Sequence, residues 1–286
     1  MTLRPFGTRL REAMDRHGPL CTGLDPHRAL VQAWGLDYTL GGLERFAMTC
    51  VDAFAGSVAV VKPQSAFFEV FGSGGIAVLE RVLADLRAAG TLTVLDVKRG
   101  DIGSTMQAYA DAYLGDDSPL RADAVTLSPF LGYESLRPAL SLAARTGRGA
   151  FVLALTSNPE GYAVQHAEHA GSTVAAGIVD GAAMDNAEAA SRGELGSVGL
   201  VVGATVGAAV ARLGLDLAAA NVPILAPGVG AQGGTAEDLR QVFGPALPNV
   251  LASSSREVLA AGPDAAALRS AAQDTAYRLR EVLLPG

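Results

Sequence analysis

Residues 91–105 read TLTVLDVKRGDIGST, and the interpretation of the whole chain starts from this stretch. It begins as a run of apolar and β-branched residues and then presents Asp96, Lys98 and Asp101 in close succession. The apolar half is typical of a parallel strand buried on both faces. On a strand, residues 96 and 98 point to the same side, so we expect their carboxylate and ammonium groups to be neighbours.

Similar apolar runs recur along the chain, and helical patterns separate them. One such pattern is AVLERVLADLRAA at 77–89, and a long amphipathic helix is expected at 265–284. Strands alternating with helices favour an α/β fold, a single (β/α)8 TIM barrel over residues 1–286. The alternative is a doubly wound open sheet, which is disfavoured because the chain has no dinucleotide fingerprint. The expected strands are 20–24, 57–61, 92–95, 122–127, 150–155, 198–203, 222–225 and 250–252.

The stretch 158–196 is rich in glycine and alanine and fits this alternation least well. It contains His166 and His169, a spacing that can place two imidazoles on one side of a helix. A third metal ligand is not evident nearby. We therefore predict a surface insertion here and no metal site.

Composition excludes several classes of protein. The 286 residues are 49% hydrophobic and 18% charged, which favours a folded core over disorder. A net charge of −7 argues against a general nucleic-acid-binding surface. Cys21 and Cys50 are too few for a disulfide framework. With no apolar leader or membrane-length apolar run in this sequence, we expect a cytoplasmic protein that binds neither nucleic acid nor a membrane.

Only two of the 22 basic side chains are lysines, Lys62 and Lys98, and each follows a β-branched run. Unlike a guanidinium, an ammonium group can lose and regain a proton in a buried site. Together with Asp96 and Asp101, the two lysines predict an alternating network of four charges. Such a network is costly to bury as a purely structural feature. It suits a reaction that develops negative charge on carbon and then needs a proton.

The ends of the other expected strands carry further polar groups, because parallel strands of a barrel present their carboxyl ends at one face. Asp25 follows the first strand. APGVGAQGG at 226–234 and SSSREV at 253–258 follow the last two. Glycine-rich loops at these positions are a common phosphate-binding arrangement, since their backbone N–H groups face an anion. Arg256 is expected to add a charge-assisted contact to the same phosphate.

The motif D-x-K-x-x-D-I at 96–102 resembles the signature of the orotidine 5'-phosphate decarboxylase family. GLD at 23–25, VKP at 61–63, LTSNPEG at 155–161, PGVGAQGG at 227–234 and SSSREV at 253–258 agree with it in order. The resemblance is to the longer bacterial subgroup, mycobacterial-like and typified by actinobacteria. It implies a homodimeric barrel without cofactor or metal that converts orotidine 5'-monophosphate to UMP and CO2 in pyrimidine biosynthesis.

The resemblance also implies roles for individual side chains. Lys98 would protonate C6 of the pyrimidine, and Asp96 would lie beside the departing carboxylate. Lys62 would hold Asp96 and the ribose, and Asp25 would bind a ribose hydroxyl. The four-charge network would include Asp101 as the remaining catalytic residue.

Further positions are implied to bind substrate or to reach the second subunit. Those that resemble residues crossing the dimer interface into the partner's site are Asp101, Ile102 and Thr105. Those that would bind the pyrimidine or the phosphate are Ser157, Gln232, Arg256 and the backbone around Ser255.

Two other functions remain open at this stage. A sugar-phosphate decarboxylase or aldolase of the same superfamily would use Mg²⁺ and would need another acidic ligand after the second strand. That position offers Lys62 and Gln64, with Glu69 well beyond. A non-catalytic nucleotide-binding barrel is the second alternative, but it would have no use for two lysines among two aspartates.

Overall fold

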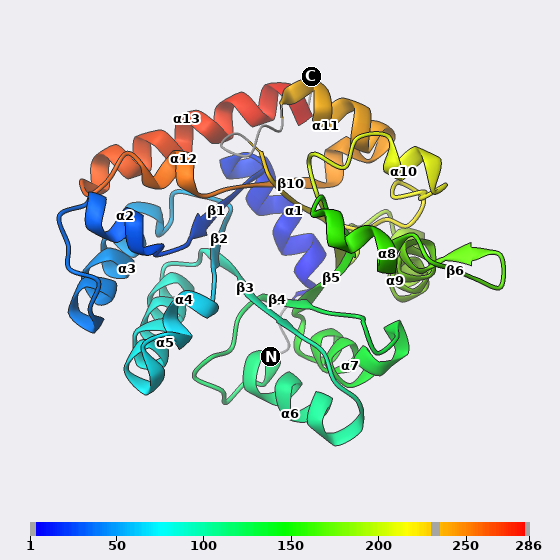
Figure 1. Ribbon diagram of the computed structural model, residues 1–286, viewed down its shortest axis with the longest axis horizontal. Helices are drawn as coiled ribbons and strands as arrows, with labels where there is room; N and C mark the ends of the chain where they lie inside the picture. The colour runs from blue at the N-terminus through cyan, green and yellow to red at the C-terminus, as the bar shows by residue number, and fades with distance from the viewer. Residues whose placement is uncertain (1–3, 230–234, 284–286) are drawn as a thin grey trace.

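The computed structural model describes residues 4–229 and 235–283, and eight of its strands are parallel and close into a barrel (Figure 1). Their order around the barrel is β1-β10-β9-β8-β5-β4-β3-β2. The ring closes where β1 pairs with β10, with Leu20 opposite Ala252. The predicted (β/α)8 barrel is confirmed, and the open sheet is wrong because the first and last strands pair. The barrel strands are β1 (Leu20–Leu24), β2 (Val60–Pro63), β3 (Leu92–Arg99), β4 (Ala124–Leu127), β5 (Gly149–Leu155), β8 (Val198–Val202), β9 (Ile224–Pro227) and β10 (Val250–Ser254).

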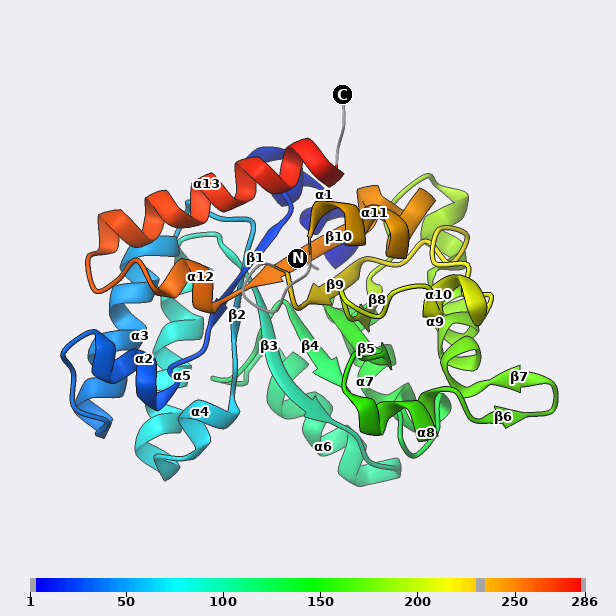
Figure 2. The same ribbon diagram turned by 45° about the horizontal axis from the view of Figure 1, so that its top comes forward.

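Helices surround this barrel (Figures 1 and 2). Within the described residues, we find no helix with the length and apolar character needed to cross a membrane. The longer helices are α1 (Phe6–His17), α3 (Leu40–Phe54), α5 (Gly72–Ala88), α6 (Gly103–Leu114), α7 (Arg137–Thr146), α9 (Val174–Ser191), α11 (Ala236–Phe243) and α13 (Ala265–Leu283). The shorter ones are α2 (Arg28–Ala33), α4 (Ala66–Glu69), α8 (Tyr162–Gln165), α10 (Ala209–Arg212) and α12 (Arg256–Leu259), with 3-10 turns η1 (Tyr133–Leu136), η2 (Pro159–Gly161) and η3 (Gly244–Asn249).

Helix α1 covers the amino-terminal end of the barrel. Its apolar face buries Phe6, Leu10 and Met14 completely. The ring of Phe6 meets that of Phe151 edge to face, with centroids 5.9 Å apart. Burial of each such side chain stabilises the fold by about 1.5–3 kcal/mol. Helix α1 therefore closes the centre of the barrel at this end, whereas the carboxyl ends of the strands stay uncovered by it.

Inside the barrel, the inward-facing side chains change from apolar to charged along a strand. Leu92, Val94 and Asp96 share the inner face of β3, because alternate residues of a strand point to one side. Leu92 and Val94 belong to the apolar cluster beneath, which also contains Val60 of β2. The next inward position of β2 is Lys62. Asp96 and Lys62 therefore both point into the barrel, one layer closer to its carboxyl end than the apolar cluster.

Two strands differ from their predicted ranges by three residues or more at one end, and the others by at most two. β2 begins at Val60 rather than at residue 57, because Ser57 belongs to the turn that ends α3. The Ser57 hydroxyl donates a hydrogen bond of 2.8 Å to the carbonyl of Ala53. β3 extends to Arg99 rather than ending at residue 95, with a shift of register against β4 after Leu95.

The prediction of a surface insertion over residues 158–196 is wrong for its second half. The short hairpin β6 (Glu168–His169) and β7 (Ser172–Thr173) does project from the barrel (Figure 2). Helix α9 instead packs on β5 and β8. The side chain of Asn186 on this helix donates a 2.8 Å hydrogen bond to the carbonyl of Val198. It also accepts a 3.1 Å hydrogen bond from the N–H of Val198. Small buried residues such as Ala182 give this helix a weak sequence pattern, which concealed it.

Candidate active site

The carboxylate of Asp96 lies at the centre of a group of polar side chains at the carboxyl end of the barrel. Its Oδ2 is 3.2 Å from Nζ of Lys62 and accepts a 2.9 Å hydrogen bond from Nε2 of Gln64. Its Oδ1 is 2.5 Å from Nζ of Lys98 and accepts a 2.8 Å hydrogen bond from the hydroxyl of Thr126. Both carboxylate oxygens are therefore held from two sides, which fixes the orientation of the group.

Lys62 connects Asp96 to a second carboxylate. Its Nζ is 3.8 Å from Oδ1 of Asp25, which follows β1. The other oxygen of Asp25 accepts a 2.6 Å hydrogen bond from the hydroxyl of Ser255, which follows β10. The chain of contacts thus runs across the first, second, third and last strands of the barrel.

Burial and charge act in opposite directions on these groups. Burial raises the pKa of the Asp96 carboxyl, but Lys62 and Lys98 together with the hydrogen bonds lower it to about 2. Burial lowers the pKa of the Lys62 ammonium, but the carboxylates of Asp25 and Asp96 outweigh this and raise it above its ordinary value. Asp96 is therefore ionised and Lys62 protonated at neutral pH, although the side chain of each is only 8% exposed.

Lys98 differs from Lys62 in both exposure and backbone conformation. Its side chain is 46% exposed, so its ammonium is reachable from the pocket. Its φ angle is +45°, a left-handed conformation that is unfavourable for a residue with a side chain. The hydroxyl of Thr126 supports this bend by accepting hydrogen bonds from the N–H groups of Val97, at 3.0 Å, and Lys98, at 2.9 Å.

The bend directs the following residues away from the lysines. A Cβ atom on Gly100 would lie 2.2 Å from the carbonyl oxygen of Ser128, so only glycine permits this close approach. Asp101 then accepts a 2.8 Å hydrogen bond from the N–H of Ile102. Within the described part of this single chain, Asp101 forms no ion pair with either lysine. In this chain the second carboxylate beside Lys62 is that of Asp25, and the place of Asp101 in the four-charge network stays a prediction.

A pocket of about 270 Å³ opens above these charges. The carboxylates and lysines form one side of it. The other side includes Pro227, Gly228 and Val229 from the start of the glycine-rich loop, together with Ser255 and Arg256. Gln232 lies outside the described residues. The charged strand ends and the described parts of both expected phosphate loops therefore face one cavity.

Three other predicted site residues do not line this pocket in the single chain. Ser157 is exposed, and the neighbouring Thr156 lines the pocket instead. Ile102 is 63% exposed, and Thr105 is also exposed on the first turns of α6.

Sequence reasoning missed two polar groups that hold Asp96, namely Gln64 and Thr126. A signal for Thr126 was present, since it shares with Ala124 the inward face of β4. A hydroxyl at an inward position near the carboxyl end of a strand has no structural need to be there. Gln64 forms an isolated β-bridge with Asp96 just beyond the end of β2. Its position after the VKP sequence did not predict this pairing.

The acidic residue beyond the second strand is engaged elsewhere. Glu69 accepts hydrogen bonds of 2.6 Å from the hydroxyl of Ser65 and 2.8 Å from the guanidinium of Arg99. Among residues 4–229 and 235–283, no group of three or more His, Cys, Asp or Glu side chains is arranged to hold a metal ion. The charged partners of Asp96 are therefore the ammonium groups of two lysines.

A (β/α)8 barrel with a buried aspartate between two lysines, facing loops suited to phosphate, is typical of the class of barrel enzymes that act on phosphorylated compounds. Comparison with family models is more specific. The model described as the orotidine 5'-phosphate decarboxylase / HUMPS family matches residues 18–271, and the chain belongs to this family.

Relatives of known sequence and structure agree with this assignment. A protein of Salinispora arenicola named orotidine 5'-phosphate decarboxylase is 61% identical over 94% of this chain and 95% of its own length. A candidate orotidine 5'-phosphate decarboxylase of Streptomyces avermitilis, known from a crystal structure, is 56% identical with a TM-score of 0.93, covering 99% of this chain and 97% of that one. The structure of Leishmania donovani OMP decarboxylase is 28% identical with a TM-score of 0.74, and the alignment covers 100% of both chains.

Proposed function

We propose that the protein is a carboxy-lyase that converts orotidine 5'-monophosphate to UMP and CO2, with residues 1–286 acting as one barrel unit. The observation that carries this proposal is the buried Asp96 carboxylate held between the ammonium groups of Lys62 and Lys98. The 61% identity to the named decarboxylase of Salinispora arenicola supports the same substrate.

Lys98 is the proton donor in this proposal. When the bond between C6 and the carboxylate breaks, its electron pair stays on C6 and CO2 leaves. The Lys98 ammonium transfers a proton to C6, and water then reprotonates the amine. The exposure of the Lys98 side chain supports this role, because the group must reach the substrate. A second ammonium nearby, that of Lys62, stabilises the negative charge that develops in the transition state.

Asp96 has two roles in this proposal. It holds Lys98 at 2.5 Å and so orients the donor. It also lies beside the substrate carboxylate, where two like charges favour departure of CO2. Gln64 and Thr126 keep the Asp96 carboxylate in place while the substrate binds.

Other residues in and around the pocket bind the rest of the nucleotide. Asp25 and Lys62 contact the ribose, and Ser157 contacts the pyrimidine after a local movement of its loop. Arg256 and Gln232 bind the phosphate with the backbone around Ser255. Arg256 begins α12 and lines the pocket, which supports this part of the proposal.

We further propose a homodimer with shared active sites, in which Asp101, Ile102 and Thr105 enter the pocket of the partner subunit. Exposed apolar side chains on the loops after β3 and β4 support an interface there. Ile102 is 63%, Phe130 77% and Leu131 53% exposed in the single chain. Large apolar side chains exposed together are typical of surfaces that bind a protein.

The Mg²⁺-dependent alternative is less well supported. It needs a free carboxylate after β2, and Glu69 is held by Ser65 and Arg99. The proposal is tested by incubating EDTA-treated protein with orotidine 5'-monophosphate and following the loss of its absorbance. We expect full turnover without added metal. Turnover that returns only with Mg²⁺, or none at all with folded protein, would overturn the proposal.

A further inference from the structure

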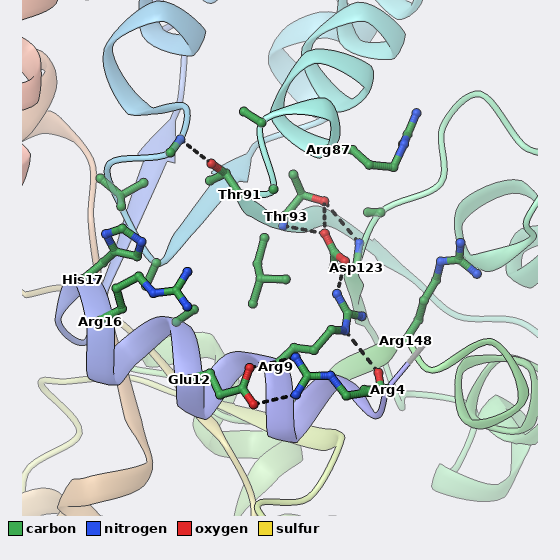
Figure 3. Close-up of a pocket in the computed structure, with 18 of the residues that line it drawn as sticks. Arg4, Arg9, Glu12, Arg16, His17, Arg87, Thr91, Thr93, Asp123 and Arg148 are labelled. Atoms are coloured by element: carbon green, nitrogen blue, oxygen red, sulfur yellow. Dashed lines mark hydrogen bonds and ion pairs between the residues drawn. The ribbon is translucent and has the colours of Figure 1, made fainter. Parts of the chain in front are cut away.

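A second and larger cavity lies at the opposite end of the barrel from the candidate active site (Figure 3). We call it the amino-terminal pocket. Its volume is about 550 Å³, compared with about 270 Å³ for the pocket above Asp96. It lies between α1 and the segments that enter β2, β3, β4 and β5, as residues such as Gly56, Leu92 and Arg148 show.

Positive charge dominates the lining of the amino-terminal pocket. Six arginines and one histidine line it, against two carboxylates. This concentration is notable because the protein as a whole has a net charge of −7. The basic residues are Arg4, Arg9, Arg16, His17, Arg87, Arg121 and Arg148, and the carboxylates are Glu12 and Asp123.

Both carboxylates are already neutralised by neighbours (Figure 3). Glu12 forms an ion pair of 2.6 Å with Arg4. Asp123 pairs with Arg9 and also accepts a 3.0 Å hydrogen bond from the N–H of Thr93. These contacts join α1 to the barrel and have an evident structural role. These pairs involve both carboxylates of the lining, against its six arginines.

Three arginines of the lining, Arg16, Arg87 and Arg121, form no ion pair with a carboxylate in the described part of the chain. Arg87 donates a 3.2 Å hydrogen bond to the carbonyl of Arg121, which brings the two residues together. Arg121 itself donates a 3.0 Å hydrogen bond to the carbonyl of Ser118. Burial and the repulsion of Arg121 lower the pKa of the Arg87 guanidinium. A role in holding the barrel end together explains Arg9 but does not explain these three.

The pocket also has an apolar surface. Val58, Ala59 and Leu92 belong to its lining, and each is buried in the wall of the barrel. Figure 3 shows Arg9 and Arg16 on α1 along one side of the space, with Arg87 and Arg148 on the other side. The volume is within the range typical of sites for small molecules. Guanidinium groups that line such a space suit phosphate groups, which a guanidinium can bind with two hydrogen bonds.

We propose that the amino-terminal pocket binds an organic polyphosphate of the nucleoside triphosphate class. Its phosphates contact Arg87 and Arg121 on one side and Arg16 on the other. Its organic part lies against Val58, Ala59 and Leu92. The ligand supplies the negative charge that the lining lacks, and this site is separate from the pocket that contains Lys98.

Binding of ATP, followed by isothermal titration calorimetry in the presence of saturating UMP, tests this proposal. UMP is included so that the phosphate loops near Arg256 are occupied. We expect the double variant Arg87→Ala/Arg121→Ala to weaken ATP binding at least about tenfold, since each lost charge-assisted contact has that effect. The variant Arg87→Gln/Arg121→Gln repeats the test with longer side chains, and thermal unfolding checks that both variants fold.

Two controls separate this pocket from other sources of binding. Arg240→Ala/Arg278→Ala removes the same charge from exposed positions elsewhere and should leave ATP affinity unchanged. Arg256→Ala should also leave it unchanged. Unaltered ATP binding in both double variants of Arg87 and Arg121, or loss of binding in Arg256→Ala, would overturn the proposal. Inorganic triphosphate that binds as tightly as ATP would overturn the assignment of an organic ligand.

Discussion

The hydroxyl of Thr126 on β4 donates a 2.8 Å hydrogen bond to Oδ1 of Asp96 on the neighbouring strand β3. The hydroxyl oxygen of Thr126 in turn accepts hydrogen bonds from the backbone N–H groups of Val97 and Lys98. One hydroxyl therefore orients the carboxylate and supports the left-handed bend that directs Lys98 into the pocket. Thr126 is a positioning residue in the proposed mechanism.

The substitution Thr126→Val removes this hydroxyl and keeps the shape of the side chain. We expect kcat to fall roughly 10- to 100-fold, because a hydrogen bond to a charged group contributes about 1.5–3 kcal/mol. The pKa of Asp96 should rise, since one group that stabilises its charged form is lost. Steady-state kinetics with orotidine 5'-monophosphate measures the first effect. Thr126→Ser, which keeps the hydroxyl, should restore most of kcat; a Val variant as active as wild type would refute the positioning role.

The barrel and the central lysine–aspartate group were predictable from sequence for a simple physical reason. Parallel strands buried on both faces need continuous apolar runs, and a charged residue that interrupts such a run stands out. Lys62, Asp96 and Lys98 were found in this way, and the alternation of side chains on β3 placed Asp96 correctly.

Other features depend on contacts that spacing does not encode. The contact of Asp25 with Lys62 joins two strand ends, and the bend at Lys98 directs Asp101 away from the lysines of its own chain; a positive φ for a lysine has no sequence signal. Helix α9 was hidden because its buried residues are small. Gln64 reaches Asp96 only through the bridge between the ends of two strands. In each case the deciding contact joins residues far apart in the chain or follows from an unusual backbone angle.

Lys98→Ala should abolish measurable turnover without unfolding the protein. The variant loses the proposed proton donor, and Asp96 loses one of its two ammonium partners. Lys98→Arg should fail nearly as badly, because a guanidinium is larger and holds its proton too tightly. Turnover of orotidine 5'-monophosphate and the thermal midpoint are measured together for both variants. Substantial turnover by folded Lys98→Arg protein would remove Lys98 from the role of donor.

The low pKa of Asp96 predicts how stability depends on pH. The folded-state value is about 2, below the ordinary 3.8, so the stabilisation is complete above 3.8 and is lost as pH falls toward 2. A shift of this size corresponds to about 2 kcal/mol of unfolding free energy. Denaturant titrations between about pH 5 and about pH 2 should show this loss in wild type and not in Asp96→Asn. The exposed Asp117→Asn should follow wild type; parallel curves for wild type and Asp96→Asn would contradict the assignment.

Arg256→Ala should weaken recognition of the substrate phosphate. Loss of a charge-assisted contact raises KM roughly 10- to 150-fold. The effect should shrink sharply for orotidine, which lacks the phosphate, and Arg240→Ala should change neither substrate's KM. Gln232→Ala, at a position outside the described residues, is expected to behave like Arg256→Ala. Equal losses for both substrates would show that these residues do not bind phosphate.

Exchange of subunits between inactive variants tests whether the active sites are shared. In the proposed homodimer, each pocket combines Lys98 of one subunit with Asp101 of the other. Homodimers of Lys98→Ala and of Asp101→Ala are then both inactive. In a mixed dimer, however, one pocket contains both substitutions and the other contains neither. This follows because a two-fold interface makes the contribution of each subunit to its partner's pocket reciprocal.

Random exchange between equal amounts of the two variants makes half of the dimers mixed, and each mixed dimer has one intact pocket of two. The mixture should therefore recover about a quarter of wild-type activity, as reciprocal two-fold geometry requires. Mixing Lys98→Ala with Asp96→Ala is the matched control. Both residues belong to the same subunit's pocket, since their side chains are 2.5 Å apart in one chain, so every pocket would carry a substitution and no activity should return. If Asp101 served its own subunit, the first mixture would stay as inactive as the control even after exchange is demonstrated by a mass-tagged subunit.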